Sequence, residues 1–163
     1  MKINLLFKNI TIKFLIYLIL TIPSFAAGTS GNNGESKKTN YDKASYVIKK
    51  AKRFEEKKKL EKAKKQYQKA IKYLQKSNQE KPNQPDTLNY LGFALRKIGN
   101  FEDAEKYYLE GLAIKPDHNG INEYLGELYI QTNRMNLAKE RLNVLINCNC
   151  EEYDELKTLI ENN

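Results

Sequence analysis

The sequence repeats itself with a period of 34 residues. Leu91-Gly92 recurs as Leu125-Gly126, 34 positions later. Within one period, apolar residues fall at helical spacing in two runs that a turn separates. A unit of this kind cannot bury both apolar faces alone, so neighbouring units have to stack on one another. The period therefore favours a stack of helical hairpins.

The unit between Pro85 and Pro116 shows the pattern most completely. Its first apolar run ends at Gly99-Asn100, two residues that accept the left-handed backbone found at helix ends. Its second run ends at Pro116, because proline cannot continue a helix. We therefore expect two antiparallel helices here. Small residues lie where their backbones would touch: Gly92, Ala104 and Gly111.

The flanking segments repeat this organisation less regularly. Residues 41–80 contain no Gly or Pro and carry two apolar stripes, separated by the polar run at 55–59. We expect a turn near Lys57–Lys59. One continuous helix is the alternative, because nothing in the sequence forces a break. In the third unit, Asn133 is expected at the left-handed turn position.

These features resemble the tetratricopeptide repeat, which has the same period. Leu91-Gly92 matches the Leu-Gly pair of the consensus, and Asn122 of the third unit stands where the consensus has tryptophan. The resemblance implies an all-α fold, a stack of three helix-turn-helix hairpins with a C-terminal capping helix. The implied domain covers 41–163, with repeats at about 44–82, 85–118 and 119–150 and the capping helix at 151–162. The tail from Cys148 to Tyr153 also resembles small exported alphaproteobacterial proteins of this kind.

The N-terminus has the composition of a targeting segment. Lys2, Lys8 and Lys13 precede a short apolar run from Phe14 to Ile22. Pro23–Ala26 resembles a signal-peptide cleavage site. The run is shorter than the roughly 20 apolar residues that span a bilayer. We expect residues 1–26 to be a signal peptide and 27–40 a disordered linker, with an uncleaved anchor as the alternative. The mature protein would be exported, periplasmic or extracellular, without a stable membrane span.

Charge is distributed unevenly along the chain. Between Lys37 and Lys81 there are 17 basic and 5 acidic residues, whereas between Pro82 and Asn163 there are 8 basic and 14 acidic ones. We call 37–81 the basic front and 82–163 the acidic back. The basic front attracts anions in general. We do not expect nucleic acid as a partner, because Phe54 and Tyr67 belong to the apolar stripe and are not free to stack on bases.

The residues that catalysis requires do not form a recognisable pattern. The single histidine, His118, lies in a polar turn and is interpreted as a solvent-exposed residue near a helix start. Glu123 and Glu127 lie one helical turn apart and are interpreted as groove or surface charges rather than a catalytic pair. There is no phosphate-binding glycine loop and no zinc-type spacing. We expect no enzyme activity, no cofactor and no metal site.

Cys148 and Cys150 are the two cysteines of the chain. In an exported protein an even number of cysteines favours a disulfide. The Cys-x-Cys ring would be very small, so two free thiols, or a redox or metal role, are the alternatives.

The resemblance also implies a concave groove lined by the first helix of each hairpin. Asn89 would hold a peptide backbone, Phe93 would offer an apolar anchor, and Arg96 would bind a carboxylate. An Arg96–Glu127 ion pair that closes the groove to acidic ligands is the alternative. The candidate partner-binding residues are Lys52, Asn89, Phe93, Arg96, Lys97, Glu123 and Glu127.

Three functions follow from these features. The first is a non-enzymatic adaptor that binds a peptide or a partner helix of an unknown protein in its groove. The second is head-to-tail self-association between the basic front and the acidic back, which salt would weaken. The third is binding to an anionic surface through Lys57–Lys69.

Overall fold

The computed structural model describes residues 38–163, so the predicted signal peptide at 1–26 and most of the predicted linker lie outside the described residues. Within that range the chain is helical. The helices are α2 (Asn40–Glu56), α3 (Leu60–Glu80), α4 (Pro85–Lys97), α5 (Phe101–Ile114), α6 (Asn119–Gln131), α7 (Met135–Leu145) and α8 (Glu151–Glu161).

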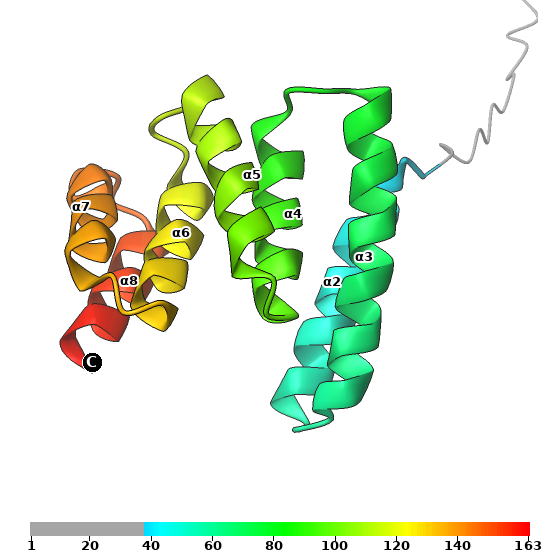
Figure 1. Cartoon of the computed structure of the whole chain (residues 1–163), viewed down its shortest axis with the longest axis horizontal. Coiled ribbons are helices and arrows are strands. Elements are labelled where there is room, and N and C mark those ends of the chain that lie inside the picture. Colours follow the sequence, from blue (N-terminus) through cyan, green and yellow to red (C-terminus); the bar gives the residue numbers. More distant parts are fainter. Residues whose placement is uncertain (1–37) are drawn as a thin grey trace, which may run out of the picture. The chain divides into compact units, whose positions relative to one another are not determined.

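Consecutive helices form three antiparallel hairpins, and α8 follows as a single helix (Figure 1). In each hairpin the two helices pack on each other: α2 on α3, α4 on α5, and α6 on α7. The first helices also contact one another in the order α2, α4, α6, and α8 lies against α6 and α7. The all-α stack of three hairpins with a C-terminal capping helix is therefore confirmed.

The helix ends follow from local chemistry. Thr39 caps α2: its hydroxyl accepts a hydrogen bond from the Asp42 backbone N–H at 3.1 Å, and its own N–H donates to the Asp42 carboxylate at 2.9 Å. The predicted linker therefore ends earlier than residue 40. Pro85 occupies the first turn of α4, where its missing N–H has no cost.

Left-handed residues make the turns. Gly99 and Asn133 have φ angles of 87° and 58°, in the turns that follow α4 and α6. Lys58 has φ 53° and separates α2 from α3, so residues 41–80 form a hairpin and not a single helix. A lysine in this backbone region is unfavourable, so the turn at Lys58 is only weakly indicated by its residues.

The Leu-Gly pairs explain the repeat in physical terms. A Cβ atom at Gly92 would lie 2.6 Å from Cδ1 of the buried Tyr108. The close approach of α4 and α5 therefore requires a residue without a side chain at position 92. At Gly126, the equivalent position 34 residues later, a Cβ would lie 2.6 Å from Cδ2 of Leu156, which belongs to α8. Gly92 therefore allows close packing of α5, the second helix of its own hairpin. Gly126 allows close packing of the capping helix α8.

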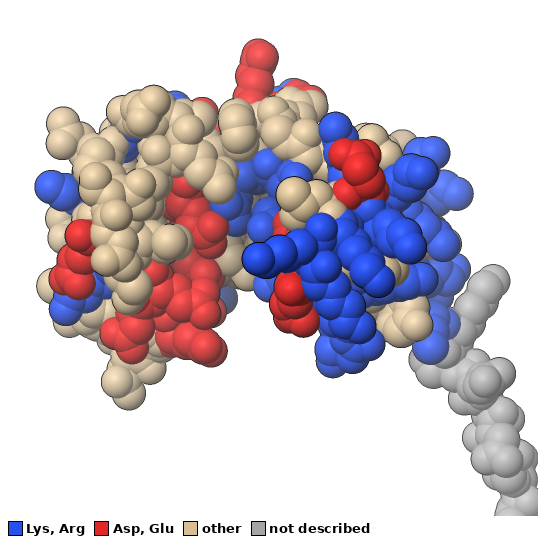
Figure 2. Space-filling model, turned by 90° about the horizontal axis from the view of Figure 1, so that it is seen from below, with Lys and Arg blue, Asp and Glu red and all other residues tan. Residues whose placement is uncertain are grey.

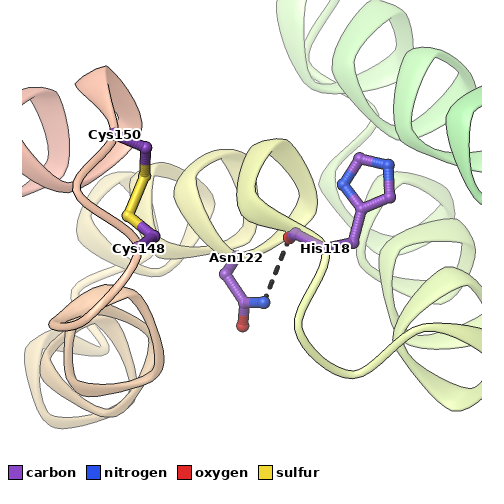
Figure 3. Close-up of a disulfide and its surroundings, with 4 residues drawn as sticks. All are labelled: His118, Asn122, Cys148 and Cys150. Atoms are coloured by element: carbon purple, nitrogen blue, oxygen red, sulfur yellow. Dashed lines mark hydrogen bonds between the residues drawn. A yellow bond between two sulfur atoms is a disulfide. The ribbon is translucent and has the colours of Figure 1, made fainter.

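Asn122 takes the place of the consensus tryptophan and is fully buried. Its side-chain NH₂ donates to the His118 carbonyl at 3.1 Å (Figure 3) and to the Pro116 carbonyl at 3.0 Å. Arg141 donates to its Oδ1 at 3.3 Å. A buried amide with its hydrogen bonds satisfied is compatible with a core. The substitution therefore connects the loop before α6 to α7 and does not open the stack.

His118 is the N-cap of α6 and is not a freely exposed turn residue. Its Nδ1 accepts from the Ile121 backbone N–H at 3.3 Å, and its Nε2 lies 3.1 Å from the Asp86 carboxylate of α4. The side chain is 13% exposed. These contacts occupy both ring nitrogens, so His118 has a structural part in joining α4 to α6.

Candidate partner-binding groove

Figure 2 shows a hollow between an acidic patch on the side of α6 and α8 and a basic surface on the side of α2 and α3. The helices α2, α4 and α6 lie in a row, with α8 beside α6. Side chains of these helices line the hollow from the basic surface to the acidic patch. We refer to this surface as the groove.

The centre of the groove is an aromatic cluster beneath cations. The Phe93 ring of α4 lies between Tyr67 of α3, with centroids 5.8 Å apart, and Tyr124 of α6, with centroids 4.9 Å apart. Lys52 of α2 places Nζ 4.9 Å from the centroid of the Phe93 ring, and the cationic groups of Arg96 and Lys97 lie 5.7 and 5.8 Å from it. Cations at these distances are attracted to the ring faces.

Phe93 is therefore a core residue and not an open anchor. Its side chain is 4% exposed, and the ring belongs to the continuous hydrophobic core. The cations above it form the part of this cluster that faces solvent, because Lys52 is exposed and Lys97 is 27% exposed. A ligand in the groove would meet these lysines before the ring.

Arg96 forms an ion pair with Glu127. Its Nη1 lies 2.8 Å from the Glu127 carboxylate, and its side chain is 2% exposed. Burial on its own lowers the pKa of Arg96, but Tyr108 and the Glu127 carboxylate outweigh it and hold the pKa above its ordinary value. The ion-pair alternative is thus the arrangement observed, and the guanidinium is engaged within the protein.

Lys97 is paired in a similar way on the basic side. Its Nζ lies 3.0 Å from the Glu55 carboxylate of α2, which also accepts a hydrogen bond from the Tyr67 hydroxyl at 2.9 Å. Both partners of the ion pair are more than a quarter exposed, so its contribution to stability is small. These contacts fix the position of the Lys97 ammonium group beside the groove.

The acidic end of the groove consists of four carboxyl groups: Glu123 and Glu127 of α6, and Glu152 and Glu155 of α8. Glu123 is 3% exposed, whereas Glu155 is exposed. Burial raises the pKa of Glu123 to about 9, together with a hydrogen bond to the Glu155 carboxyl group and the negative charges of Glu127, Glu155 and Glu152. Glu123 therefore carries a proton at neutral pH.

Asn89 lies apart from this centre, against the start of α6. Its side chain is 7% exposed, and a Cβ at Gly120 would lie 2.9 Å from its Nδ2. No hydrogen-bond donor for its Oδ1 is found within residues 38–163. The Asn89 amide is covered in this arrangement and is not presented to a ligand.

Cys148 and Cys150 form a disulfide in the loop between α7 and α8 (Figure 3). Cys150 is also the N-cap of α8, so the bridge lies at the start of the capping helix. Residues 38–163 hold no group of three or more His, Cys, Asp or Glu side chains placed to bind a metal ion. None of the helices in that range is long and apolar enough to cross a membrane.

Comparison with known proteins identifies the repeat. Residues 62–121 match the sequence profile of the tetratricopeptide repeat. This segment carries the tetratricopeptide repeat. No match was found among curated proteins.

Solved structures share the tetratricopeptide fold at low sequence identity. The Yersinia enterocolitica type III secretion translocator chaperone SycD has a TM-score of 0.53 and 16% identity, over 74% of this chain and 83% of SycD. The MamA RS-1 ArsTM double mutant has a TM-score of 0.53 and 19% identity, over 74% of this chain and 65% of that one. A tetratricopeptide repeat protein from Parabacteroides merdae has a TM-score of 0.52 and 16% identity, over 72% and 59% of the two chains.

The tetratricopeptide stack brings six of the seven candidate residues to the groove. Lys52, Phe93, Arg96 and Lys97 meet at its centre, Glu123 and Glu127 lie at its acidic end, and Asn89 is separate. Sequence reasoning did not select three further residues that shape the site, namely Glu55, Tyr124 and Glu155. The helical spacing of Tyr124 relative to Glu127 was a usable signal. Glu155 had none, because it lies outside the 34-residue period.

We expect Glu123 to make the stability of the tetratricopeptide stack depend on pH. An unfolded Glu123 releases its proton near its ordinary pKa of 4.5, whereas the folded protein holds that proton up to about pH 9. Between these values the folded state binds more protons, so the free energy of unfolding falls as the pH rises, by up to about 1.4 kcal/mol per pH unit from this group.

The measurement compares wild type with Glu123→Gln by urea unfolding at pH values below, within and above this window. The difference between the two proteins isolates Glu123 from the other carboxyl groups. Glu123→Gln should become progressively more stable than wild type as the pH rises. Parallel pH profiles of the two proteins would contradict the prediction.

Proposed function

We propose that the protein is an exported, non-enzymatic adaptor that binds a segment of a partner protein in the groove. The observation that carries this proposal is the groove itself, in which an exposed lysine and half-exposed charges lie over an aromatic centre. Tetratricopeptide stacks are interaction modules, and SycD, whose fold this chain shares, is a translocator chaperone. A rigid floor with charged side chains above it suits recognition of a polar, extended segment.

Export is supported by two separate features. The N-terminal segment has the basic and apolar regions of a signal peptide and a small-residue cleavage site. Cys148 and Cys150 are joined by a disulfide, a bond that persists in oxidising compartments. We therefore place the adaptor in the periplasm or outside the cell.

The test is partner capture by the full chain with exposed groove residues changed. Phe93 and Arg96 are too deeply buried for this purpose, because their replacement would alter the fold. The double variant Lys52→Gln and Lys97→Gln removes two groove charges, and Lys106→Gln with Lys139→Gln removes two exposed charges from α5 and α7. The groove variant should lose a partner from an exported-protein extract that wild type and the control both retain. Equal retention by all three proteins would refute groove binding.

Self-association is the second candidate, because the charges of the chain are separated in space. The basic surface lies on the side of α2 and α3, and the acidic patch lies on the side of α6 and α8 (Figure 2). One molecule's basic surface would meet the next molecule's acidic patch. Sedimentation velocity at low and high salt tests this, since screening weakens contacts between exposed charges. A monomer at both salt concentrations would exclude self-association.

Sedimentation with anionic vesicles would test binding to an anionic surface through Lys57–Lys69.

A further inference from the structure

The disulfide between Cys148 and Cys150 is accessible from solvent. It encloses a single residue, Asn149, in the loop between α7 and α8 (Figure 3). Asn149 is exposed, and both cysteines are partly exposed. Exposed disulfides are more easily reduced than the protected bridges that only stabilise a fold. A thiol in solution can therefore reach this bond.

The capping helix is held in place by packing rather than by this bond. Leu156 of α8 is fully buried and fills the depression at Gly126, and α8 contacts both α6 and α7. Leu145, at the end of α7, is 1% exposed. A disulfide stabilises a fold less as the loop that it closes becomes shorter, and this loop is among the shortest possible. The bridge can therefore open without the loss of α8.

An open pocket of about 510 Å³ lies beside the bridge. It is lined by Ile146, Asn149, Cys150, Glu151, Tyr153 and Asp154. Its apolar side chains are accessible, because Ile146 is 60% exposed and Tyr153 is partly exposed. A segment that packs on these two side chains would bring a cysteine of its own to the sulfur of Cys150.

The pocket carries negative charge. Glu151 and Asp154 line it, and Glu152 belongs to the same first turn of α8. Lys157, further along α8, places one positive charge 5.9 Å from the centroid of the Tyr153 ring, and the three carboxylates outweigh it. A negative surface attracts cationic reactants and repels anionic ones. The pocket therefore favours a thiol that is carried on a basic segment.

We propose that the Cys148–Cys150 bridge is a thiol–disulfide exchange site. Its substrate is a pair of cysteine thiols on a basic segment of another protein, which the bridge converts to a disulfide. This inference goes beyond the proposed function, because the bridge lies in the loop between α7 and α8 and the groove has no part in the reaction. Each molecule transfers its bridge once, so the protein acts as a stoichiometric oxidant.

The exchange consists of two substitutions at sulfur. A thiolate of the substrate attacks Sγ of Cys150, the bond to Cys148 breaks, and Cys148 leaves as a thiolate that takes a proton from solvent. The second substrate thiolate attacks the substrate sulfur of this mixed disulfide and releases Cys150, which is protonated in turn. The substrate loses two electrons and two protons and forms its disulfide. The bridge gains two electrons and two protons and becomes two thiols.

The first measurement compares the full chain with a reference peptide that has the same bridge without the pocket. The reference is N-acetyl-Cys-Asn-Cys amide in its oxidised form. Cysteamine, a cationic thiol, and 3-mercaptopropionate, an anionic one, react with each at equal thiolate concentrations, and mass spectrometry follows the products. The ratio of the cysteamine rate to the mercaptopropionate rate should be about tenfold higher for the full chain, and high salt should reduce this difference.

The second measurement uses a dithiol substrate. The N-acetylated peptide amides KCGSCK and ECGSCE differ only in the charges beside their cysteines. One equivalent of the full chain should oxidise KCGSCK and end as the dithiol, and it should oxidise ECGSCE about tenfold more slowly. A bridge that stays intact while the reference peptide is reduced would overturn the inference, and so would equal rates with KCGSCK and ECGSCE.

A variant without the bridge separates the chemistry from the fold. Cys148→Ser combined with Cys150→Ser should oxidise neither peptide and should keep the helix content of wild type, measured by circular dichroism. A loss of helix content would show that the bridge is structural and would overturn the inference. Partner capture in the groove is measured separately on the same variant, so the exchange reaction and the proposed function fail independently.

Charge variants test the selection of a basic segment. Glu151→Gln combined with Asp154→Asn should lose most of the preference for KCGSCK over ECGSCE. Glu102→Gln combined with Glu110→Gln removes two exposed charges from α5 and should keep that preference. The same preference in both double variants would mean that the pocket does not select the substrate, and it would overturn that part of the inference.

Discussion

Replacing Phe93 by alanine is expected to lower the free energy of unfolding by about 3–5 kcal/mol. The ring is 4% exposed and touches aromatic residues of the hairpins on both sides, Tyr67 and Tyr124. Its removal therefore leaves a cavity where all three hairpins meet. The same change also removes the ring face that holds Lys52 and Lys97 above the groove.

The control for Phe93 is a change to a cation above the ring. Lys52→Ala removes a cation–aromatic contact at an exposed site and should cost about 1 kcal/mol or less. Urea unfolding followed by circular dichroism measures both variants. If Phe93→Ala lowers the free energy of unfolding as little as Lys52→Ala, Phe93 is not a core residue. The interpretation of Phe93 as an apolar anchor for a ligand would then be supported.

Gly92→Ala is expected to lower stability by about 2–3 kcal/mol, although alanine is the better helix former. The added methyl group would overlap the Tyr108 ring, which is fully buried and has no room to turn aside. The helix propensity gain of about 1 kcal/mol is smaller than the cost of moving the ring, so the steric effect determines the sign.

Gly111→Ala is the matched comparison for Gly92→Ala. It makes the same substitution in the partner helix α5, but the methyl group would meet one terminal methyl group, Cδ1 of the buried Ile121, at 2.5 Å, rather than the face of an aromatic ring. We expect a clearly smaller loss, measured as the difference in urea midpoint. An equal loss in both variants would show that the extent of the overlap with the Tyr108 ring is not the cause.

The fold was predictable because it depends on spacing. The recurrence of Leu91-Gly92 at Leu125-Gly126 and the turn residues Gly99 and Asn133 determine where helices start, stop and touch. The turn at Lys58 was expected but weakly specified, since lysine has no preference for a left-handed backbone. The helix α2 begins at Asn40, one residue before the predicted start, because the capping box of Thr39 with Asp42 begins the helix there.

The sequence pattern indicates which residues lie on the row of first helices, but not whether their side chains are exposed to solvent. Their position in α4 places Phe93 and Arg96 on the row formed by α2, α4 and α6. Whether they remain open depends on neighbours from other hairpins, Tyr124 above all, and a periodic pattern does not report those contacts. The high pKa of Glu123 depends on Glu155, a residue of α8 that falls outside the repeat. Long-range electrostatic effects of this kind require the three-dimensional structure.

The contact between Gly126 and Leu156 bears on how such an array can evolve. Repeat proteins change length by duplicating whole units, and each new unit has to fit against the one before it. Here the surface where a fourth hairpin would dock is already filled by α8, whose Leu156 occupies the depression at Gly126. Lengthening the array at this end would require the loss of α8, and with it Glu152 and Glu155. Selection for the acidic end of the groove would then also hold the number of repeats constant.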